Sequence, residues 1–506
     1  MKVFVKVSRT LSLLLMFASL FCACNVPEPL PTATSTPDWT ATPIPPSPTP
    51  TQTPTPTETP LPAYLEIDPQ SLEGTGLTLR YSLDGPVREK LEELTERFNA
   101  ENPEGITVSV QPAYSMEELA ESIPESGTEK ADIIIADSAW LRSLDRDNAL
   151  LLDLSGFMND PDLSLDAENI QAIMPVMLEP ENRGNSFYAL PLYAEPSFLF
   201  YNKTWAIELG FPDTPEDLAA FAKQACAAGK ANYADEDDKK HGTGGWIISA
   251  NPGGVISWLL TFAPIARTPG QILRDDNGDI FTDTADWLRN LYDNGCAWNS
   301  RVKEPYDYFA NRYALFYSGT YADAERQYNA FEQSKQNGFD NWDLIVYPRR
   351  SAGKGTDPRI FADTVSIAIP QGEAKDVNAA WHFIRWLYQD EHAAELALSA
   401  DGWPVQDNAA ITRLYRNSGK DKLYQTLSYR QYLVNNDADE NWLTDQMILS
   451  DGFAYIFNLS AKAEDIPGIW EQIGTSIAEI NAVSTVSENG ISEYTSDTGG
   501  TNENES

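Results

Sequence analysis

Acidic and aromatic residues follow two predicted strands, in positions from which they could bind a small polar ligand. Asp84 comes after the strand predicted at 77–81, and Asp137 and Trp140 come after the apolar strand predicted at 131–136. Carboxylates accept hydrogen bonds from hydroxyl groups, and aromatic planes pack against the C–H faces of sugar rings. Structural roles stay open for all three: a turn for Asp84, a helix cap for Asp137, and packing under the next helix for Trp140.

Three further candidates lie later in the chain. Trp246 follows the glycine-rich approach Gly242-Thr-Gly-Gly, Asp363 precedes a buried strand, and Trp403 lies in a Gly-Trp-Pro turn. We expect each of them to contact a ligand at the edge of a cleft. Packing in the core or at its rim is the alternative, because most of the 13 Trp, 22 Tyr and 20 Phe must be core residues.

The sequence offers little for catalysis. Only three His occur, which argues against a His-rich metal site or a His-dependent triad. No P-loop, G-x-S-x-G or H-E-x-x-H pattern is present. We therefore expect a binding protein with no cofactor, no metal and no enzymatic activity. A secreted glycosidase remains an alternative, because 75 acidic residues always permit a catalytic carboxylate pair.

The charge balance narrows the classes of partner. The 36 Lys and Arg stand against 75 Asp and Glu, a formal net charge of −39. A nucleic acid would be repelled by this charge, and a broad face for anionic membranes is disfavoured for the same reason. The length of 506 residues and the 42% apolar content suit large folded cores.

Strand and helix patterns alternate at the start of the folded body. Strands are predicted at 77–81, 106–110 and 131–136, with an amphipathic helix at 87–99 and a short helix at 116–123. The last strand is continuously apolar, as a buried parallel sheet requires. This alternation predicts an α/β fold with ligands at the carboxyl ends of the strands.

The N-terminus predicts export. Lys2, Lys6 and Arg9 precede an apolar run at 11–23, which is short for a membrane span and typical of a secretory signal. Ala23-Cys24 resembles the lipobox of bacterial lipoproteins, with Cys24 as the lipidated residue, although Phe21 replaces the usual Leu. We predict a signal peptide at 1–23 and a protein attached to the outer face of the cell membrane only through its lipid. Ordinary cleavage near Ala23 is the alternative.

The ends of the mature chain are predicted to be unfolded. Between residues 25 and 62 there are 13 Pro and 11 Thr, and Pro removes backbone donors, so residues 24–76 are predicted as an extended disordered linker. Residues 484–506 are rich in Ser, Thr, Gly and Asn and are predicted as a disordered tail.

Two cysteines remain beyond the signal, Cys226 and Cys296. In an exported protein such a pair predicts a disulfide. Each lies late in a predicted helix, at 218–228 and 285–296. Two separate buried thiols are the alternative.

An ordered set of motifs resembles one family. The run at 187–203, which ends in Tyr-Asn-Lys, resembles the interlobe crossover of the maltose-binding-protein-like carbohydrate binders among the extracellular solute-binding proteins of ABC importers. Leu-Gly-Phe-Pro at 209–212 and Thr-Pro-Glu at 214–216 follow it, as in the family. Further marks in family order lie at 98–108, 131–133, 148–154, 313–321 and 363–387. The set covers about residues 77–405.

The resemblance implies a type II periplasmic-binding-protein fold with two α/β lobes and a hinge at 194–196. One lobe would comprise 77–193 and 340–388, and the other 197–339 and 389–483. Ligand would be trapped in the cleft between them. By the resemblance Glu195, with Tyr193 beside it, would contact a sugar, and Tyr321 aligns with the stacking Trp of the family.

The implied protein is a monomer that captures a sugar or oligosaccharide and delivers it to the permease subunits of an ABC transporter. Its motion would be a hinge closure in which ligand shifts the population toward the closed state. Two alternatives stay open besides the glycosidase. The same fold could bind a polyamine, an anion or a peptide, or the chain could be a sensory or adhesion module.

Overall fold

The computed structural model describes residues 62–479 except 124–129, 146–149, 185, 234, 238–241, 276–277, 301–303, 352–356, 390, 435, 437–440 and 459. The predicted signal peptide with Cys24, the linker up to residue 61 and the tail at 484–506 lie outside the described residues. Among the residues that are described, no helix combines the length and the apolar character needed to cross a membrane.

A six-stranded mixed sheet forms the first half of the architecture. In sheet order the strands are β13 (Trp403–Pro404), β6 (Leu190–Pro196), β12 (Ala362–Ala368), β3 (Ile133–Asp137), β1 (Gly76–Tyr81) and β2 (Thr107–Pro112). β1 is parallel to both β2 and β3, whereas β12 is antiparallel to β3 and β6, and β13 is antiparallel to β6.

A five-stranded sheet forms the second half. In sheet order the strands are β11 (Trp342–Ile345), β7 (Phe198–Asn202), β10 (Phe316–Gly319), β8 (Trp246–Ile247) and β9 (Ala297–Trp298). The central strand, β10, is antiparallel to β7 and parallel to β8. A separate hairpin joins β4 (Asn182–Arg183) to β5 (Ser186–Phe187).

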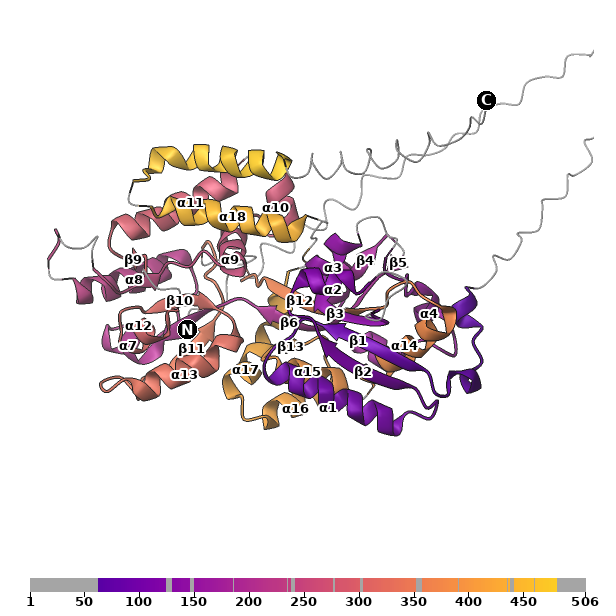
Figure 1. Ribbon diagram of the computed structural model, residues 1–506. Helices are drawn as coiled ribbons and strands as arrows, with labels where there is room; N and C mark the ends of the chain where they lie inside the picture. Colours follow the sequence, from indigo (N-terminus) through magenta and orange to yellow (C-terminus); the bar gives the residue numbers. More distant parts are fainter. Residues whose placement is uncertain are drawn as a thin grey trace, which may run out of the picture. The chain divides into compact units, whose positions relative to one another are not determined.

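Helices cover both sheets. Figure 1 shows α1, α14 and α15 beside the six-stranded sheet and α8, α9, α11 and α18 beside the five-stranded sheet. Up to β6 the helices are α1 (Pro86–Glu101), α2 (Met116–Glu121), α3 (Ser138–Leu144), α4 (Ser155–Asn159), α5 (Ala167–Ala172) and α6 (Pro175–Leu178). Those between β7 and β11 are α7 (Lys203–Glu208), α8 (Leu218–Asn232), α9 (Pro252–Phe262), α10 (Pro269–Asp275), α11 (Asp279–Asp293), α12 (Tyr306–Ala310) and α13 (Ala324–Gln333).

The remaining helices follow β12. They are α14 (Ala374–Leu387), α15 (His392–Ser399), α16 (Ala409–Asn417), α17 (Asp421–Thr426) and α18 (Trp442–Ile456), and residues 466–479 are also helical. Short 3-10 helices are η1 (Ala63–Leu65), η2 (Pro69–Leu72), η3 (Glu179–Glu181), η4 (Tyr321–Asp323), η5 (Leu427–Tyr432) and η6 (Ala463–Asp465).

The early elements form where the residue pattern predicts them. Gly85 adopts φ 67° and Pro86 follows as the first residue of α1, a combination that starts a helix without losing a backbone hydrogen bond. The buried residues of α1 include Leu91, Leu94 and Phe98, spaced three and four apart on one face. In β3 the first four residues are all buried, as expected of a strand covered on both sides.

The chain crosses between the two sheets three times. It leaves the six-stranded sheet at Ser197, between β6 and β7, and returns between β11 and β12. After β13 it crosses again, since α18 packs against α9. α18 also packs against α3, which begins at the end of β3, so this helix contacts both halves.

Two predicted lobe boundaries are wrong. β11 was expected with the first lobe, but it pairs with β7 in the five-stranded sheet, where Trp342 stacks on Phe200 at 5.1 Å between ring centroids. Conversely, α15 and β13 were expected in the second lobe, but both pack on β6 of the six-stranded sheet. The chain therefore changes sheet after β11 and stays with the first sheet as far as β13.

The end of the predicted linker is folded, contrary to expectation. Tyr64 packs against Phe157 with ring centroids 4.8 Å apart, and the Asn378 amide donates to the Tyr64 carbonyl at 2.7 Å. Leu72 is fully buried. Apolar side chains return to the sequence at 64–72, and their burial against the first sheet offsets the entropy of ordering the chain.

Cys226 and Cys296 form a disulfide in the structure, with their Cα atoms 4.1 Å apart. Cys226 lies in α8, as predicted. Cys296 lies beyond the end of α11 and directly before β9, rather than within a helix. The bridge therefore ties a covering helix to an edge of the five-stranded sheet.

Candidate functional site

A cavity of about 340 Å³ is lined by residues from both sheets. Its size falls at the lower end of the range of small-molecule sites, roughly 300–1,000 Å³. We call it the acid pocket, because four of its lining residues are Asp or Glu and none is Lys, Arg or His. The lining consists of Asp137, Glu195, Ser197, Asn251, Pro252, Gly253, Gly319, Thr320, Asp323, Asp363, Leu443 and Gln446.

Strand register gathers three of the carboxylates. Glu195 on β6 lies directly opposite Asp363 on β12, and Asp137 at the end of β3 lies opposite Val365. Because residues two apart on a strand share a face, these three side chains project from the same face of the six-stranded sheet. Like charges placed directly opposite one another destabilise a sheet, so this arrangement has a cost that structure alone does not offset.

Burial and mutual repulsion raise the pKa values of this cluster. Burial, together with the charges of Asp137 and Glu195, raises the pKa of Asp363 to about 8, although Gln446 donates a hydrogen bond to it. Burial and the charges of Asp137 and Asp323 raise the pKa of Glu195. Burial also raises the pKa of Asp137 despite backbone hydrogen bonds from Trp140 and Ala139.

The fourth carboxylate comes from the five-stranded half and is held firmly. Asp323 accepts hydrogen bonds from the Thr320 backbone N–H at 3.1 Å and from the Tyr306 hydroxyl at 2.6 Å. A Cβ on Gly319 would lie 2.5 Å from the Asp323 Oδ2 atom, so the absence of a side chain at 319 makes room for this carboxylate.

The remaining walls come from the first crossing, α9 and α18. Ser197 lies between β6 and β7 and is only 6% exposed. Gly253 in the first turn of α9 faces it closely, since a Cβ there would lie 2.3 Å from the Ser197 Oγ atom. Asn251 caps α9 by accepting from the Gly254 N–H at 2.6 Å, and Gln446 of α18 reaches Asp363. Thus the first crossing and the helix that follows the third crossing both contribute to the acid pocket.

The predicted ligand-binding residues divide into two groups. Asp137, Glu195 and Asp363 meet in the acid pocket. Asp137 also caps α3 by accepting from the Trp140 N–H at 3.0 Å, so the predicted cap is confirmed and contact with a ligand stays a prediction. The other six do not line the cavity: Asp84, Trp140, Tyr193, Trp246, Tyr321 and Trp403.

The predicted stacking tryptophans require correction. Trp246 and Trp403 are both 0% exposed. Trp246 packs edge-on against Trp258 in the core of the five-stranded half. The Trp403 indole N–H donates to Thr426 Oγ1 at 2.9 Å. An indole that is large and apolar enough for ligand stacking is equally suited to filling a core, and here the core takes both.

The other four candidates also lie apart from the lining. Asp84 is exposed in the loop between β1 and α1. Trp140 is half-buried and packs with the cluster that includes Leu141. Tyr193 and Tyr321 are buried in the main core cluster. Tyr321 directly follows Thr320, and Tyr193 is two residues from Glu195, so both lie in segments that contribute other side chains to the lining.

Sequence reasoning missed Ser197, Asn251, Thr320, Asp323 and Gln446. Ser197 and Thr320 adjoin residues that were predicted, and Asp323 follows the same Ser-Gly turn as Tyr321. Asn251-Pro252 is an N-cap and first-turn pair that a capping search would locate. Gln446 carries no local signal, because its role depends on the packing of a helix 83 residues beyond Asp363.

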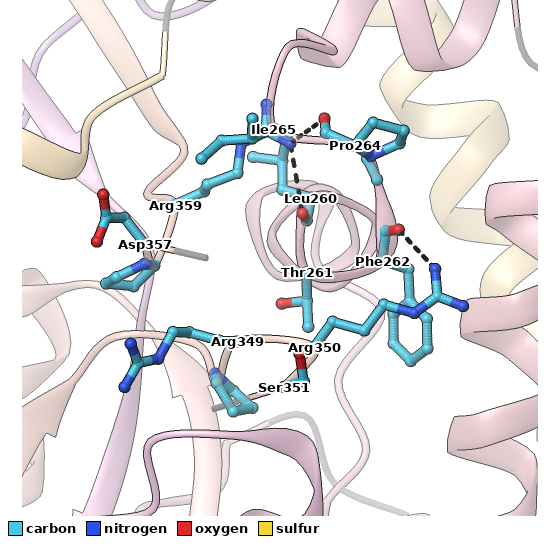
Figure 2. Close-up of a pocket in the computed structure, with 13 residues that line it drawn as sticks. Leu260, Thr261, Phe262, Pro264, Ile265, Arg349, Arg350, Ser351, Asp357 and Arg359 are labelled. Atoms are coloured by element: carbon cyan, nitrogen blue, oxygen red, sulfur yellow. Dashed lines mark hydrogen bonds between the residues drawn. The ribbon is translucent and has the colours of Figure 1, made fainter. Parts of the chain in front are cut away.

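A second cavity of about 300 Å³ lies at the C-terminal end of α9 and contains three arginines. Figure 2 shows Arg350 and Arg359 pointing at carbonyls of that helix end. Arg350 donates to the Phe262 carbonyl at 3.2 Å and pairs with Asp283, and Arg359 donates to the Leu260 and Pro264 carbonyls. Burial lowers the pKa of Arg359 to about 10. These guanidinium groups satisfy the last carbonyls of α9, which is a structural role.

Within the described residues, no group of three or more His, Cys, Asp or Glu side chains is arranged to hold a metal ion. The acid pocket offers four acidic side chains as hydrogen-bond acceptors, together with the hydroxyl and amide groups of Ser197, Thr320, Asn251 and Gln446. It suits a polar solute that offers several donors.

The sequence matches the family described as bacterial extracellular solute-binding protein over residues 93–423. Among curated proteins, none matches this chain.

Solved structures of binding proteins share the fold at low sequence identity. The sugar-binding protein MalE from Xanthomonas citri has a TM-score of 0.63 and 16% identity, with 81% of this chain and 99% of that chain covered. The cyclic alpha-maltosyl-1,6-maltose binding protein from Arthrobacter globiformis has a TM-score of 0.61 and 14% identity, with 80% and 98% covered. A family 1 extracellular solute-binding protein from Bifidobacterium longum subsp. infantis has a TM-score of 0.59 and 12% identity, with 80% and 100% covered. The predicted two-lobed α/β fold is confirmed.

Proposed function

Because the chain belongs to the bacterial extracellular solute-binding protein family, we propose that it is the binding subunit of an ABC importer. It captures a sugar or oligosaccharide in the acid pocket and delivers it to the permease. It works as a monomer at the outer face of the cell membrane, held there by a lipid on Cys24. Solved structures of the same fold include a cyclic alpha-maltosyl-1,6-maltose binding protein and a sugar-binding protein, which supports this choice of ligand class.

The observation that carries the proposal is the make-up of the acid pocket. Its lining combines the ends of β3, β6 and β12 with Gly319, Thr320 and Asp323 from the other half of the chain. A solute bound there contacts both halves at once. Such a solute favours the conformation in which both sets of contacts form, which is the thermodynamic basis of closure around a ligand.

Each lining carboxylate accepts hydrogen bonds from sugar hydroxyls. Glu195 accepts none from a described residue, so both of its oxygens are available. Asp323 presents a carboxylate that is already oriented by Thr320 and Tyr306, which lowers the entropy lost when a ligand binds.

Glu195→Gln tests the site. Replacing the carboxylate by an amide removes a charge-assisted hydrogen bond, so affinity should fall by at least about tenfold, or 1.4 kcal/mol. The measurement is isothermal titration with a panel of mono- and oligosaccharides, after thermal-shift screening selects the ligand. Glu168→Gln, at an exposed position of α5, is the matched control and should bind like the wild type. Equal affinity of the wild type and Glu195→Gln would remove this residue from the site.

A glycosidase remains the second candidate, because Glu195 and Asp363 face one another and the pKa of Asp363 is raised to about 8. The same ligand panel decides between the two functions. Incubation at 37 °C followed by chromatography of the sugars should return each ligand intact. Release of shorter sugars that Glu195→Gln no longer produces would replace binding by hydrolysis as the function.

A further inference from the structure

We infer that the solute captured in the acid pocket carries a protonated amine, and that it belongs to the amino sugars. This inference rests on the proposed function, because it names the class of solute that the same site selects. Three features of the site support it: the charge of the lining, one unpartnered hydroxyl, and the absence of aromatic rings among the lining residues.

The charge of the acid pocket is one-sided. Asp137, Glu195, Asp323 and Asp363 line it, and no Lys, Arg or His is among the lining residues. Asp363 and Glu195 are directly opposed across two strands, and each is influenced by the charge of Asp137. A neutral hydroxyl can donate a hydrogen bond here but leaves this repulsion in place. An ammonium group donates and also supplies the missing positive charge, so it gains more from the same contacts.

A second observation points to a ligand at the same place. Ser197 lines the acid pocket and is more than nine-tenths buried, yet its hydroxyl forms no hydrogen bond with another described residue. The Oγ atom lies towards Gly253, a neighbouring lining residue. The Oγ atom keeps some exposure, so a ligand or solvent in the acid pocket can supply the hydrogen bond that the protein does not. Ser197 can accept a hydrogen bond from an amine, and it can also exchange hydrogen bonds with a sugar hydroxyl.

The third observation concerns what the lining lacks. None of its residues is aromatic, and Leu443 and Pro252 supply its larger apolar side chains. Stacking on an aromatic plane, which commonly holds a neutral sugar ring, is not offered by this lining. Polar and ionic contacts must therefore carry the affinity. A hydroxylated ring that bears an ammonium group satisfies this lining better than a neutral oligosaccharide does.

Matched ligands test the inference. The β-1,4-linked dimers of glucosamine, N-acetylglucosamine and glucose share ring and linkage, but only the first carries protonated amines. Isothermal titration of the full-length protein at pH 6.5 in 150 mM NaCl should show the glucosamine dimer binding at least about tenfold more tightly than either neutral dimer. Glu195→Gln and Asp323→Asn should each reduce that preference, and Glu168→Gln should retain it.

The outcomes separate this inference from the proposed function. If a neutral dimer or a maltose series binds as tightly as the amine, the inference is overturned and sugar capture stands. If spermidine binds and no sugar does, the amine is upheld and sugar capture fails. A protein that shows no preference for any amine overturns the inference. The same is true if millimolar Ca²⁺ binds and displaces the amine, because a metal ion would then supply the charge.

Preference could also arise from general attraction to a chain of net charge −39. Repeating the titration at 500 mM NaCl removes that contribution, since the Debye length falls to a few ångströms. If the preference for the amine survives at high salt in the wild type and in Glu168→Gln, but not in Glu195→Gln, the preference arises in the acid pocket. Melting curves of all variants establish that each is folded.

Discussion

At the scale of single residues, Asp363 links the site to stability. Its pKa is about 8 in the folded protein against 3.8 for a free carboxyl. Between these pH values the folded state binds more protons than the unfolded state. The stabilisation that protonated Asp363 contributes is therefore complete below about pH 4 and is lost as the pH rises through 8. Asp363→Asn keeps the shape and does not titrate. Relative to the wild type, we expect its melting temperature to gain at least about 2 °C between pH 5 and pH 8.

The groups that face Asp363 define the control. Asp137 approaches from β3 and Glu195 from β6, while Gln446 of α18 donates to it. Asp137 and Glu195 titrate in both proteins and Gln446 in neither, so the difference between the two melting profiles is assigned to Asp363. Glu168→Gln should follow the wild-type profile. Parallel curves for Asp363→Asn and the wild type across this range would contradict the raised pKa.

Residue type alone predicted carboxylates better than aromatics. Asp137 and Asp363 stand at strand ends, and both line the acid pocket. Trp246 and Trp403 follow equally suggestive turns but are buried, because sequence does not distinguish a ring that meets a ligand from one that fills a core. Asp323 was missed because its relation to Glu195 exists only after the chain has folded.

At the scale of elements, the disulfide between α8 and the start of β9 should be a major stabilising link. It closes a loop over a separation of 70 residues, for which chain entropy gives about 4 kcal/mol. The double variant Cys226→Ser/Cys296→Ser should lose stability by up to this amount in urea unfolding. Neither cysteine lines the acid pocket, so ligand affinity should be retained.

Reductant provides the control for the disulfide. When urea unfolding is repeated in the presence of dithiothreitol, the stability of the wild type should fall to that of the double variant. The stability of the double variant should not change on addition of the reductant. A wild type that is insensitive to reductant would mean that the bridge contributes nothing. A loss of affinity in the variant would mean instead that the α8–β9 link positions the site.

Element prediction worked where periodicity was long and failed where strands were short. The predicted order from 77 to 136 corresponds to β1, α1, β2, α2 and β3, each shifted by a few residues at most. β11 has four residues, and nothing in them specifies a partner; its pairing with β7 depends on contacts such as Trp342 on Phe200. Residues 63–72 were grouped with the Pro-rich linker because composition averages over the few apolar side chains that dock.

At the scale of the whole molecule, the connections between the sheets explain why one pocket can sense both halves. Ser197 lies at the first crossing and lines the acid pocket, and α18 follows the third crossing and contributes Leu443 and Gln446. A shift of one half therefore changes the site through chain that belongs to the connections themselves. The negative charge of the chain adds a long-range attraction for cationic solutes that salt weakens.

The proposed lipid anchor on Cys24 is testable on the full chain. Two acyl chains bury many methylene groups at about 0.8 kcal/mol each, enough for stable membrane attachment, whereas an unmodified chain end offers none. Cys24→Ala should therefore move the protein from the detergent phase to the aqueous phase in Triton X-114 partitioning, with ligand affinity unchanged. Cys226→Ser/Cys296→Ser, which leaves Cys24 in place, should remain in the detergent phase. Membrane association that persists in Cys24→Ala would refute the anchor.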